Sequence, residues 1–459
     1  MPTPNLDKIA NEGIRFTDAH SSSGICTPSR YSLLTGRHHW RKFHGIVNSF
    51  DEPVIDNARL TLPEMLKSRG YATACIGKWH LGWNWPIVNP PSLKKEMWGR
   101  EVLYYATEDI DWSKPVSGGP LDHGFDYYFG DDVPNFPPYA WIENDKVVTI
   151  PTLPLTENPP TAEGSWEARP GPMVDGWQMD AVMPELTKKA VKWINEQKRS
   201  EKPFFLYFPF TSPHAPIVPA KEFIGKSQAG GYGDFMFQTD WTVGEVLKAL
   251  EKNGFRNNTL VIFTSDNGPE HYAYDRIRNF DHRSMGPLRG LKRDIWEGGH
   301  RVPFIARWPE MIKSNLVKTA LICQTDIMAT IASIIDYDLP DDSAEDSYDQ
   351  SINLFGTSEV DIRSVQIHNT FADHYAIRKD DWLLINAKSG EVTKEPEWYL
   401  EDNGYVENEH DQALFNLSDD VSQHINLISD NPGKAQELDS ILQKIREQGY
   451  SSPRLEDSN

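Results

Sequence analysis

Short runs of apolar, β-favouring residues recur along this 459-residue chain, and longer stretches with helical spacing separate them. The runs at 71–77, 203–210 and 259–265 are continuously apolar, as in strands that are covered on both faces. Strands of that kind occur in parallel sheets with helices on each side. The pattern predicts an α/β fold with a doubly wound, mostly parallel sheet flanked by helices.

The helical stretches between these runs have clear local signals. Residues 61–64 read Thr-Leu-Pro-Glu, a capping box that predicts a helix ending at Gly70. Residues 179–197 and 234–252 place apolar side chains three and four residues apart, which predicts two longer amphipathic helices.

The alternation ends near residue 355. Alternating segments at 375–378 and 382–386, and a last helical pattern at 434–448, predict a small antiparallel sheet with one helix. We therefore expect a large domain over 1–355 and a C-terminal α+β subdomain over 356–459, since domains usually have ~100–200 residues and α/β domains run larger.

Composition excludes several classes of protein. The chain has 46 basic and 67 acidic residues and a net charge of −21, which argues against a nucleic-acid partner. No apolar run approaches the ~18 residues that a membrane span needs, so we expect no membrane span. Three cysteines are too few for a disulfide framework.

Polar residues with catalytic chemistry follow the three apolar runs. Lys78 and His80 follow the first run, His214 follows the second, and Asp266 and Asn267 follow the third. Ligands bind at the carboxyl ends of strands in open α/β sheets, so we expect these side chains to gather at one edge. Each residue alone has a structural interpretation, such as a solvated lysine or an Asp-Asn-Gly turn. Together they supply a cation, two acid–base groups and two oxygen ligands.

A fourth feature is the stretch Cys26-Thr27-Pro28-Ser29-Arg30, which continues as Tyr-Ser-Leu-Leu-Thr-Gly-Arg. A strand at 14–17 and a loop of small residues precede it. Thr27 is predicted as the N-cap of a helix and Pro28 as its first residue. Cys26 would then lie at a helix N-terminus, where unpaired N–H groups and the helix dipole favour an anion. The structural alternative is a capped helix with a buried cysteine.

This twelve-residue stretch resembles the signature in which sulfatases convert a cysteine to formylglycine. Further similar motifs follow in the same order as in the arylsulfatase-A-like branch of the alkaline phosphatase superfamily. They are residues 77–82, 123–126 with Gly130, 265–268, 290–292, 297–303 and 413–417. The resemblance covers nearly the whole chain, and it implies an alkaline phosphatase-like fold.

The resemblance also implies a role for each matching residue. Cys26 would become formylglycine, whose hydrate attacks the sulfate sulfur, and Arg30 would orient that hydrate. Lys78 and Lys292 would bind sulfate oxygens as fixed positive charges. A maturation enzyme, either formylglycine-generating or anaerobic, would be a partner of this chain.

The remaining motif residues would handle protons and a metal ion. His80 matches the base that breaks the sulfated hydrate, and His214 matches the acid that protonates the leaving alcohol. Asp266 and Asn267 match two ligands of a divalent cation, usually Ca²⁺, which prefers hard oxygen ligands. The chemistry agrees, because charge develops on the sulfate oxygens and the leaving oxygen in the transition state.

One departure concerns the N-terminus. Family members begin with an apolar strand that ends in two carboxylates of the metal site, but this chain starts at Met1-Pro2, shortly before the family's Thr-Pro-Asn-Leu-Asp. Neither Asp18 nor Asp131-Asp132 replaces those carboxylates convincingly. We therefore expect an N-terminal strand to be missing by truncation and the Ca²⁺ site to be incomplete. A signal peptide on the missing part would place the protein in the periplasm or outside the cell.

Substrate recognition is expected in the aromatic-rich, irregular region from about residue 83 to 175. Aromatic side chains stack on sugar rings, which favours a sulfated glycan over another sulfated small molecule. Packing of these tryptophans in the core or in loops is an equal alternative. The predicted substrate-binding residues are Trp83, Trp85, Asn135, Trp177, His271 and Arg283.

The sequence thus predicts a sulfuric ester hydrolase that acts on a sulfated carbohydrate. A phosphodiesterase or phosphonate hydrolase of the same superfamily is one alternative, and comparing aryl sulfates with aryl phosphodiesters separates the two. A non-catalytic relative that binds sulfated glycans is another. That protein would bind sulfated sugars and turn none of them over.

Overall fold

A computed structural model describes most of the chain. The described residues are 1–97, 100–155, 160–164, 168–356 and 360–455. The chain divides into two compact units, which we treat separately: unit 1 is Met1–Asp7 with Val47–Arg256, and unit 2 is Lys8–Ile46 with Asn257–Asn459. Helix α1 (Pro4–Asn11) includes residues of both units. Within the described residues, no helix is long and apolar enough to cross a membrane.

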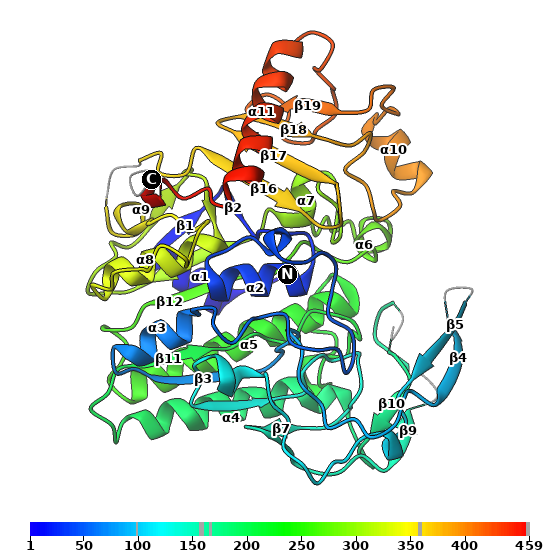
Figure 1. Cartoon of the computed structure of the whole chain (residues 1–459), viewed down its shortest axis with the longest axis vertical. Helices are drawn as coiled ribbons and strands as arrows, with labels where there is room; N and C mark the ends of the chain where they lie inside the picture. Colours follow the sequence, from blue (N-terminus) through cyan, green and yellow to red (C-terminus); the bar gives the residue numbers. More distant parts are fainter. Residues whose placement is uncertain (98–99, 156–159, 165–167, 357–359, 456–459) are drawn as a thin grey trace. The chain divides into compact units, whose positions relative to one another are not determined.

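Unit 1 is built on a five-stranded sheet with the order β11-β3-β6-β7-β8. Figure 1 labels three of its strands, β11, β3 and β7. Its strands are β3 (Ala72–Ile76), β6 (Tyr127–Gly130), β7 (Ile142–Glu143), β8 (Lys146–Val147) and β11 (Phe204–Tyr207). Strands β11, β3 and β6 run parallel, whereas β7 and β8 are antiparallel additions. The parallel part brings three carboxyl ends to one edge of the sheet.

The helices of unit 1 form where the sequence predicts them. The capping box of Thr61 and Glu64 opens α3 (Leu62–Ser68). Helix α4 (Val182–Gln197) buries Leu186, Ala190 and Ile194, and it packs against α5 (Gly230–Lys252) and contacts β3 and β6. Burial of one apolar stripe against the sheet therefore stabilises these helices.

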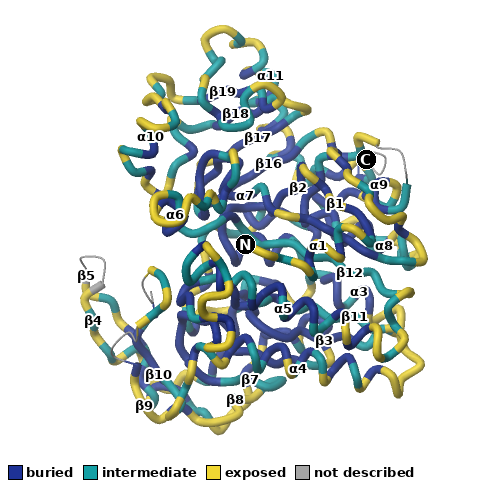
Figure 2. Tube along the Cα trace, turned by 180° about the vertical axis from the view of Figure 1, so that it is seen from behind, coloured by how far each residue is buried: buried dark blue, intermediate teal, exposed yellow. Residues whose placement is uncertain are grey.

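The irregular region of unit 1 contains two short hairpins. These are β4 (Leu93–Met97) with β5 (Arg100–Tyr104), and β9 (Leu153–Leu155) with β10 (Gly171–Met173). Figure 2 shows that the β4–β5 hairpin is exposed along much of its length. Much of the remaining region is buried, in agreement with its aromatic composition.

Unit 2 contains a mixed sheet with the order β12-β13-β1-β14. Its strands are β1 (Ile14–Phe16), β12 (Val261–Thr264), β13 (Phe304–Arg307) and β14 (Leu316–Lys318). Strand β13 is antiparallel to both β12 and β1, and β14 is parallel to β1. Short strands β2 (Ala19–His20) and β15 (Ile322–Cys323) form a parallel pair. The helices that follow are α2 (Cys26–Thr35), α6 (Ala273–Phe280), α7 (Glu297–His300), α8 (Ile327–Ile334) and α9 (Ser351–Phe355).

The last part of unit 2 is an antiparallel meander. Strands β16 (Val365–Asn369), β17 (Tyr375–Lys379), β18 (Trp382–Ile385) and β19 (Ala413–Asn416) pair in chain order. Helix α10 (Glu397–Asn403) lies between β18 and β19 in the sequence, and α11 (Pro432–Gln448) packs along β17 and β18 (Figure 1). The apolar cluster that joins α11 to the meander includes Ile377, Leu384, Leu414, Leu438 and Leu442.

Two strands lie at sheet edges although their sequences are apolar. Within the described residues, β11 pairs only with β3, and β12 pairs only with β13. Every residue of β11 and β12 is half-buried, whereas β13 is fully buried and β3 almost so. Each of these strands therefore has one side that pairs with no other strand in the described part of the chain.

The structure confirms the α/β fold class, and the predicted strands and long helices form close to their predicted bounds. The sheets are more mixed than the expected parallel arrangement, because β13 runs against both of its neighbours. The N-cap prediction for α2 was wrong: the helix begins at Cys26, and Ile25 is its extended N-cap. Proline fits any first-turn position because the N–H groups there have no partner within the helix, so Pro28 could not fix the start.

Candidate functional site

The candidate nucleophile in unit 2 is the first residue of a buried helix. Cys26 begins α2 and is 3% exposed, and Ile25 provides no side-chain cap. The hydroxyl of Ser29 in the first turn donates to the carbonyl of Ser23 at 2.9 Å, which fixes the preceding loop. Residue 26 thus lies at the positive end of a helix dipole, as predicted, where an anion is stabilised.

The strand end after β12 brings two oxygen donors to this helix. Arg30 Nε and Nη2 both contact Asp266 Oδ2, at 2.9 and 2.8 Å. The Cys26 thiol donates to Asn267 Oδ1 at 3.3 Å. A Cβ on Gly268 would come within 1.9 Å of the Gly298 carbonyl oxygen, so only glycine permits this close turn. Unit 2 therefore brings together four of the residues that the sequence predicted for the site.

Lys292 belongs to a cluster around Glu270. Its Nζ lies 3.4 Å from Glu270 Oε2, and Arg293 binds both oxygens of the same carboxylate, at 2.5 and 2.9 Å. Burial alone would lower the pKa of Lys292, but the negative groups at Cys26, Glu270 and Asp266 outweigh burial and raise this pKa. Lys292 is therefore a buried, permanently charged ammonium.

Glu270 is a site residue that sequence reasoning missed. Burial would raise the pKa of its carboxyl, but Lys292 and hydrogen bonds from His271 and Arg293 hold that pKa well below its usual value. The only sequence signal was its place three residues after Asn267. Glu270 keeps two cations beside the catalytic helix.

The donor set of unit 2 fits a hard cation only in part. Asp266 and Asn267 offer oxygen ligands of the kind that Ca²⁺ prefers, but Ca²⁺ takes six to eight of them. No group of three potential metal-ligating side chains forms around Asp266 within the described residues. These two residues alone therefore do not complete a calcium site, and we derive no reaction step through the ion.

Unit 1 carries the candidate residues that follow β3. A Cβ on Gly77 would lie 2.2 Å from the Pro209 carbonyl oxygen, and Gly77 has a φ of +121°, so the chain leaves β3 through a position that requires glycine. The backbone N–H of Lys78 donates to the same carbonyl at 2.9 Å. Lys78 and His80 are 1% and 3% exposed, so both are held within the core.

His80 has a fixed orientation. Its φ is +57°, an uncommon value for a residue with a side chain, and its N–H donates to Asp132 Oδ1 at 3.0 Å. Its Nε2 lies 2.9 Å from the Val47 carbonyl oxygen, so Nε2 carries the proton and Nδ1 is the basic nitrogen. The ring of Phe136 packs edge-on at 5.4 Å. This tautomer provides a base at Nδ1.

Asp131 is a second residue that the sequence did not assign. It follows β6, the parallel neighbour of β3, and is 2% exposed. Burial raises the pKa of Asp131 to about 7. The negative charge of Asp132 also raises this pKa, whereas the positive charge of Lys78 lowers it. The sequence contained the Asp-Asp pair, but β6 was not predicted as a strand. Asp131 therefore exchanges a proton near neutral pH beside Lys78.

His214 follows β11, the other parallel neighbour of β3. Its Nδ1 donates to the Ala215 carbonyl oxygen at 2.6 Å, and the residue is partly exposed. Lys78 and His80 follow β3, Asp131 follows β6, and His214 follows β11. Because these strands are parallel, their carboxyl ends lie along one edge of the sheet, as predicted.

The predicted substrate-binding residues have different environments. Trp83 and Trp85 are buried and pack on Tyr128 and Phe50, with ring centroids 5.3 and 5.2 Å apart. Their burial favours the packing interpretation that the sequence left open. Trp177 faces Trp141 at 5.0 Å beside a cavity of ≈ 450 Å³.

The other three predicted substrate-binding residues are polar. Asn135 is buried in unit 1. In unit 2, His271 is exposed and its Nδ1 bonds Glu270, and the exposed Arg283 contacts Asn403 at 3.3 Å. Their assignment to substrate stays a prediction.

Arg169 is a cation near His80 that was not predicted. Its guanidinium lies 3.7 Å from the ring centre of Phe136, which is the ring that packs on His80. No local sequence pattern indicated Arg169, because its contact with Phe136 joins residues more than thirty positions apart. Burial lowers its pKa, but an arginine stays charged. Arg169 thus adds a positive charge to this part of unit 1.

Comparison with known proteins agrees with these features. The sulfatase family model matches residues 1–337. The chain is 33% identical to the N-acetylgalactosamine-6-O-sulfatase of Bacteroides thetaiotaomicron, over 97% of this chain and 88% of that protein. It is 30% identical to arylsulfatase G of Canis lupus familiaris, over 97% of this chain and 79% of that protein.

Solved structures show the same fold. A Bacteroides thetaiotaomicron sulfatase structure, described under the metabolism of multiple glycosaminoglycans, has a TM-score of 0.79 and 30% identity, and the match covers 97% of this chain and 94% of that one. The structure of a Pseudoalteromonas sulfatase has a TM-score of 0.72 and 24% identity, and the match covers 98% of this chain and 85% of that one. At this identity the similarity concerns the fold alone.

The chain belongs to the sulfatase family, whose members are sulfuric ester hydrolases. This confirms the predicted family, the alkaline phosphatase-like fold class and the enzyme class. The family generally uses a formylglycine and a divalent metal ion. The roles of individual residues, the domain limits at 355 and 356, and the identity of the metal ion stay predictions.

Proposed function

We propose that this sulfatase hydrolyses a sulfate ester on a sulfated carbohydrate, through a formylglycine hydrate at position 26. The first substrate to test is a 6-O-sulfated N-acetylgalactosamine, because the relative that acts on this sugar matches nearly the whole chain. The observation that carries the proposal is the arrangement in unit 2. There Cys26 begins a helix, its thiol contacts Asn267, and Arg30 binds Asp266.

The residues of unit 2 prepare the nucleophile and hold the anion. One hydroxyl of the hydrate at residue 26 releases its proton to solvent and attacks sulfur, and the bond between sulfur and the sugar oxygen breaks. Arg30 and the helix N-terminus orient that hydroxyl, and the buried ammonium of Lys292 neutralises the sulfate oxygens. Asp266 and Asn267 are the oxygen ligands that this unit contributes to a divalent cation, for which Ca²⁺ is the first choice.

The residues of unit 1 move protons and add positive charge. His214 donates a proton to the leaving sugar oxygen, which would otherwise depart as an alkoxide. His80 accepts the proton of the second hydroxyl at its Nδ1, so that the C–O bond of the sulfated hydrate breaks, sulfate leaves and the aldehyde returns. Lys78 provides a second fixed charge for the sulfate oxygens.

The proposal is tested by co-expressing the chain with a formylglycine-generating or anaerobic maturation enzyme. Peptide mass spectrometry should show conversion at residue 26, and released sulfate should be measured on a 6-O-sulfated sugar, an aryl sulfate and an aryl phosphodiester. Cys26→Ala is the matched control and should release no sulfate from any of them.

Two results would contradict the proposal. Faster turnover of the phosphodiester than of either sulfate would favour the phosphodiesterase alternative. Conversion at Cys26 with tight binding of sulfated sugar but no sulfate release would favour the non-catalytic glycan-binding alternative.

A further inference from the structure

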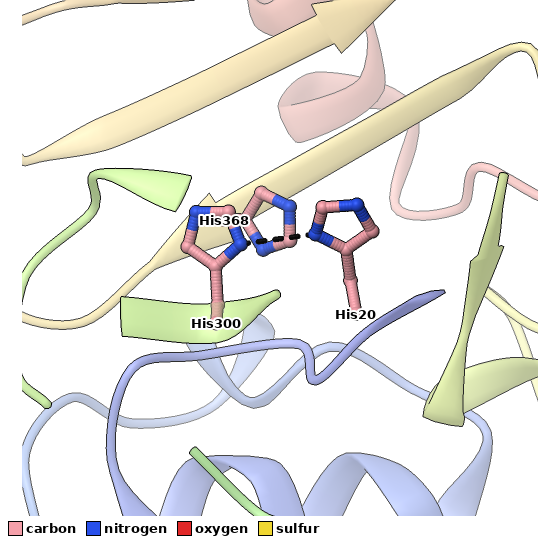
Figure 3. Close-up of side chains that lie close together, drawn as sticks. All are labelled: His20, His300 and His368. Carbon is pink, nitrogen blue, oxygen red and sulfur yellow. Dashed lines mark hydrogen bonds between the residues drawn. The ribbon is translucent and has the colours of Figure 1, made fainter. Parts of the chain in front are cut away.

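Unit 2 contains a second group of ligating side chains that the proposed reaction does not use. His20 ends β2, His300 ends α7 and His368 lies on β16, and none is more than 1% exposed. One nitrogen from each ring lies within 4.8 Å of the others. Figure 3 shows the three rings side by side, with His20 and His300 joined through their nitrogens.

The partners of His20 and His300 determine which nitrogen of each ring carries the proton. His20 Nε2 lies 2.8 Å from Asp18 Oδ1, so it donates to a carboxylate. His300 Nε2 lies 3.2 Å from the Ile295 carbonyl oxygen, so it donates to an acceptor as well. In a neutral ring the other nitrogen then has a lone pair. Nδ1 of both rings is therefore an acceptor.

These two acceptor nitrogens face each other at 3.1 Å. Two lone pairs at this distance repel unless a cation lies between them. In a tetrahedral zinc site with Zn–N of 2.0–2.1 Å, two nitrogen ligands lie about 3.3 Å apart, which is close to the observed separation.

His368 gives an independent indication of an occupant. Both of its ring nitrogens are buried and have no hydrogen-bond partner within the described residues. A neutral imidazole always has one donor and one acceptor, and native cores rarely leave both unsatisfied.

The surroundings are those of a metal site. The contact from Asp18 to His20 Nε2 is the carboxylate–histidine arrangement that orients metal-bound histidines, and the Ile295 carbonyl has the same function for His300. Glu297 is fully buried, lies in the same ligand group as His20, and has an Oε1 without a partner among the described residues. Arg378 and Arg301 also bind the Asp18 carboxylate.

We infer that His20, His300 and His368 form a structural site for a divalent transition-metal ion with the ligand preference of Zn²⁺. The ion binds Nδ1 of His20 and Nδ1 of His300, and it joins β2 and α7 to the C-terminal meander through His368. This site is separate from the oxygen ligands at Asp266 and Asn267, and it goes beyond the proposed function.

The ring stacking makes the three ligands unequal. The rings of His300 and His368 are 3.5 Å apart and inclined by 13°, so one ion cannot lie in both ring planes. The ring of His368 turns about its side-chain bonds to bring a nitrogen to the ion. We therefore expect His20 and His300 to determine the affinity and His368 to strengthen it.

The test uses the full chain, stripped with a chelator and titrated with Zn²⁺ against a chromophoric competitor in excess Ca²⁺. One Zn²⁺ per chain should bind. His20→Asn and His300→Asn should weaken binding by at least ~100-fold and His368→Gln by about 10-fold, since loss of even an outer partner costs ~10–100-fold. His38→Gln is the matched control, because His38 is also a buried histidine of unit 2 whose ring nitrogens have no hydrogen-bond partner among the described residues. It should not change the affinity.

Cobalt substitution keeps the inference testable if a variant does not fold. Co²⁺ in the unmodified chain should give the visible bands of a tetrahedral site, without the sulfur-to-metal absorption that the three cysteines would cause. Failure to bind one Zn²⁺ or Co²⁺ per chain would overturn the inference, as would a sulfur band or unchanged affinity in His300→Asn. Sulfatase activity enters none of these readouts, so they do not depend on the proposed function.

Discussion

Replacing Glu270 by glutamine should test how strongly one carboxylate organises the charges of unit 2. The substitution keeps the shape of the side chain and removes its charge. Lys292 then loses a partner at 3.4 Å, and Arg293 loses a two-oxygen contact. The side chains of Glu270 and Lys292 are 11% and 8% exposed, so solvent replaces little of the lost interaction.

The magnitude follows from the buried pair. At 3.4 Å and an effective dielectric constant of about 20, the attraction between Glu270 and Lys292 is roughly 5 kcal/mol, before desolvation of both groups offsets much of it. Removing one partner of a buried pair typically costs ~3–5 kcal/mol. Arg293 is one-third exposed and regains water, so we expect the free energy of unfolding to fall by about 3 kcal/mol.

The measurement is urea denaturation followed by tryptophan fluorescence, at several pH values. Glu270 has a lowered pKa in the folded state, so its contribution is complete above its unfolded pKa of about 4.5 and is lost as the pH falls below it. The difference between the two proteins should therefore be constant near neutral pH and shrink in acid. Glu245→Gln, which breaks an exposed pair with Lys248, is the control and should cost less than about 0.5 kcal/mol. A loss below about 1 kcal/mol for Glu270→Gln, or no change of that loss with pH, would refute the reasoning.

Three further predictions concern catalysis, pH and local stability. His214→Ala should slow the hydrolysis of sugar sulfates ~10²–10⁴-fold and that of phenyl sulfates much less. His80→Ala should trap a sulfated adduct that is visible by intact-mass analysis. Equal slowing of both substrates by His214→Ala, with no adduct in His80→Ala, would contradict these roles. Burial lowers the pKa of His38 to about 4 and holds that of His39 well below its usual value, so stability should be full above pH 6.5 and fall as the pH drops below it, by about 3 kcal/mol for His38. His38→Gln should flatten this dependence in acid denaturation curves. Thr61→Ala should cost about 1 kcal/mol in thermal unfolding because the capping box is lost, whereas Thr61→Ser should cost far less.

The sequence predicted those features whose causes are local. The capping box at Thr61 lies within four residues, and the apolar run that became β12 is continuous, so neither depends on distant contacts. Strand β6 was not predicted, because its four residues, Tyr-Tyr-Phe-Gly, lie in a region rich in aromatic residues and proline. Its place beside β3 results from parallel pairing across some fifty residues of chain.

In the candidate site, too, the sequence predicted the residues with local signals and missed those that depend on distant contacts. The sequence placed Cys26 at a helix start and Asp266 at a strand end, and the structure brings these elements together in unit 2. Asp131 and Arg169 were missed because their importance arises from burial and from contacts with residues far along the chain. Such effects depend on tertiary packing, which a single sequence does not display.

The unpaired side of β12 affects how firmly Asp266 and Asn267 are held. Among the described residues β12 is bonded to β13 alone, so every second N–H of this four-residue strand points away from the ladder. Amide hydrogens on that side should exchange with solvent much faster than those of β13, although both strands are apolar. The turn that carries the two oxygen donors directly follows β12, so each opening of this strand displaces both of them. Under the proposed function, the fraction of molecules ready to bind a cation at these two residues depends on the local opening equilibrium of one edge strand. A substitution that stabilises the whole protein without changing this opening equilibrium should leave that fraction unchanged.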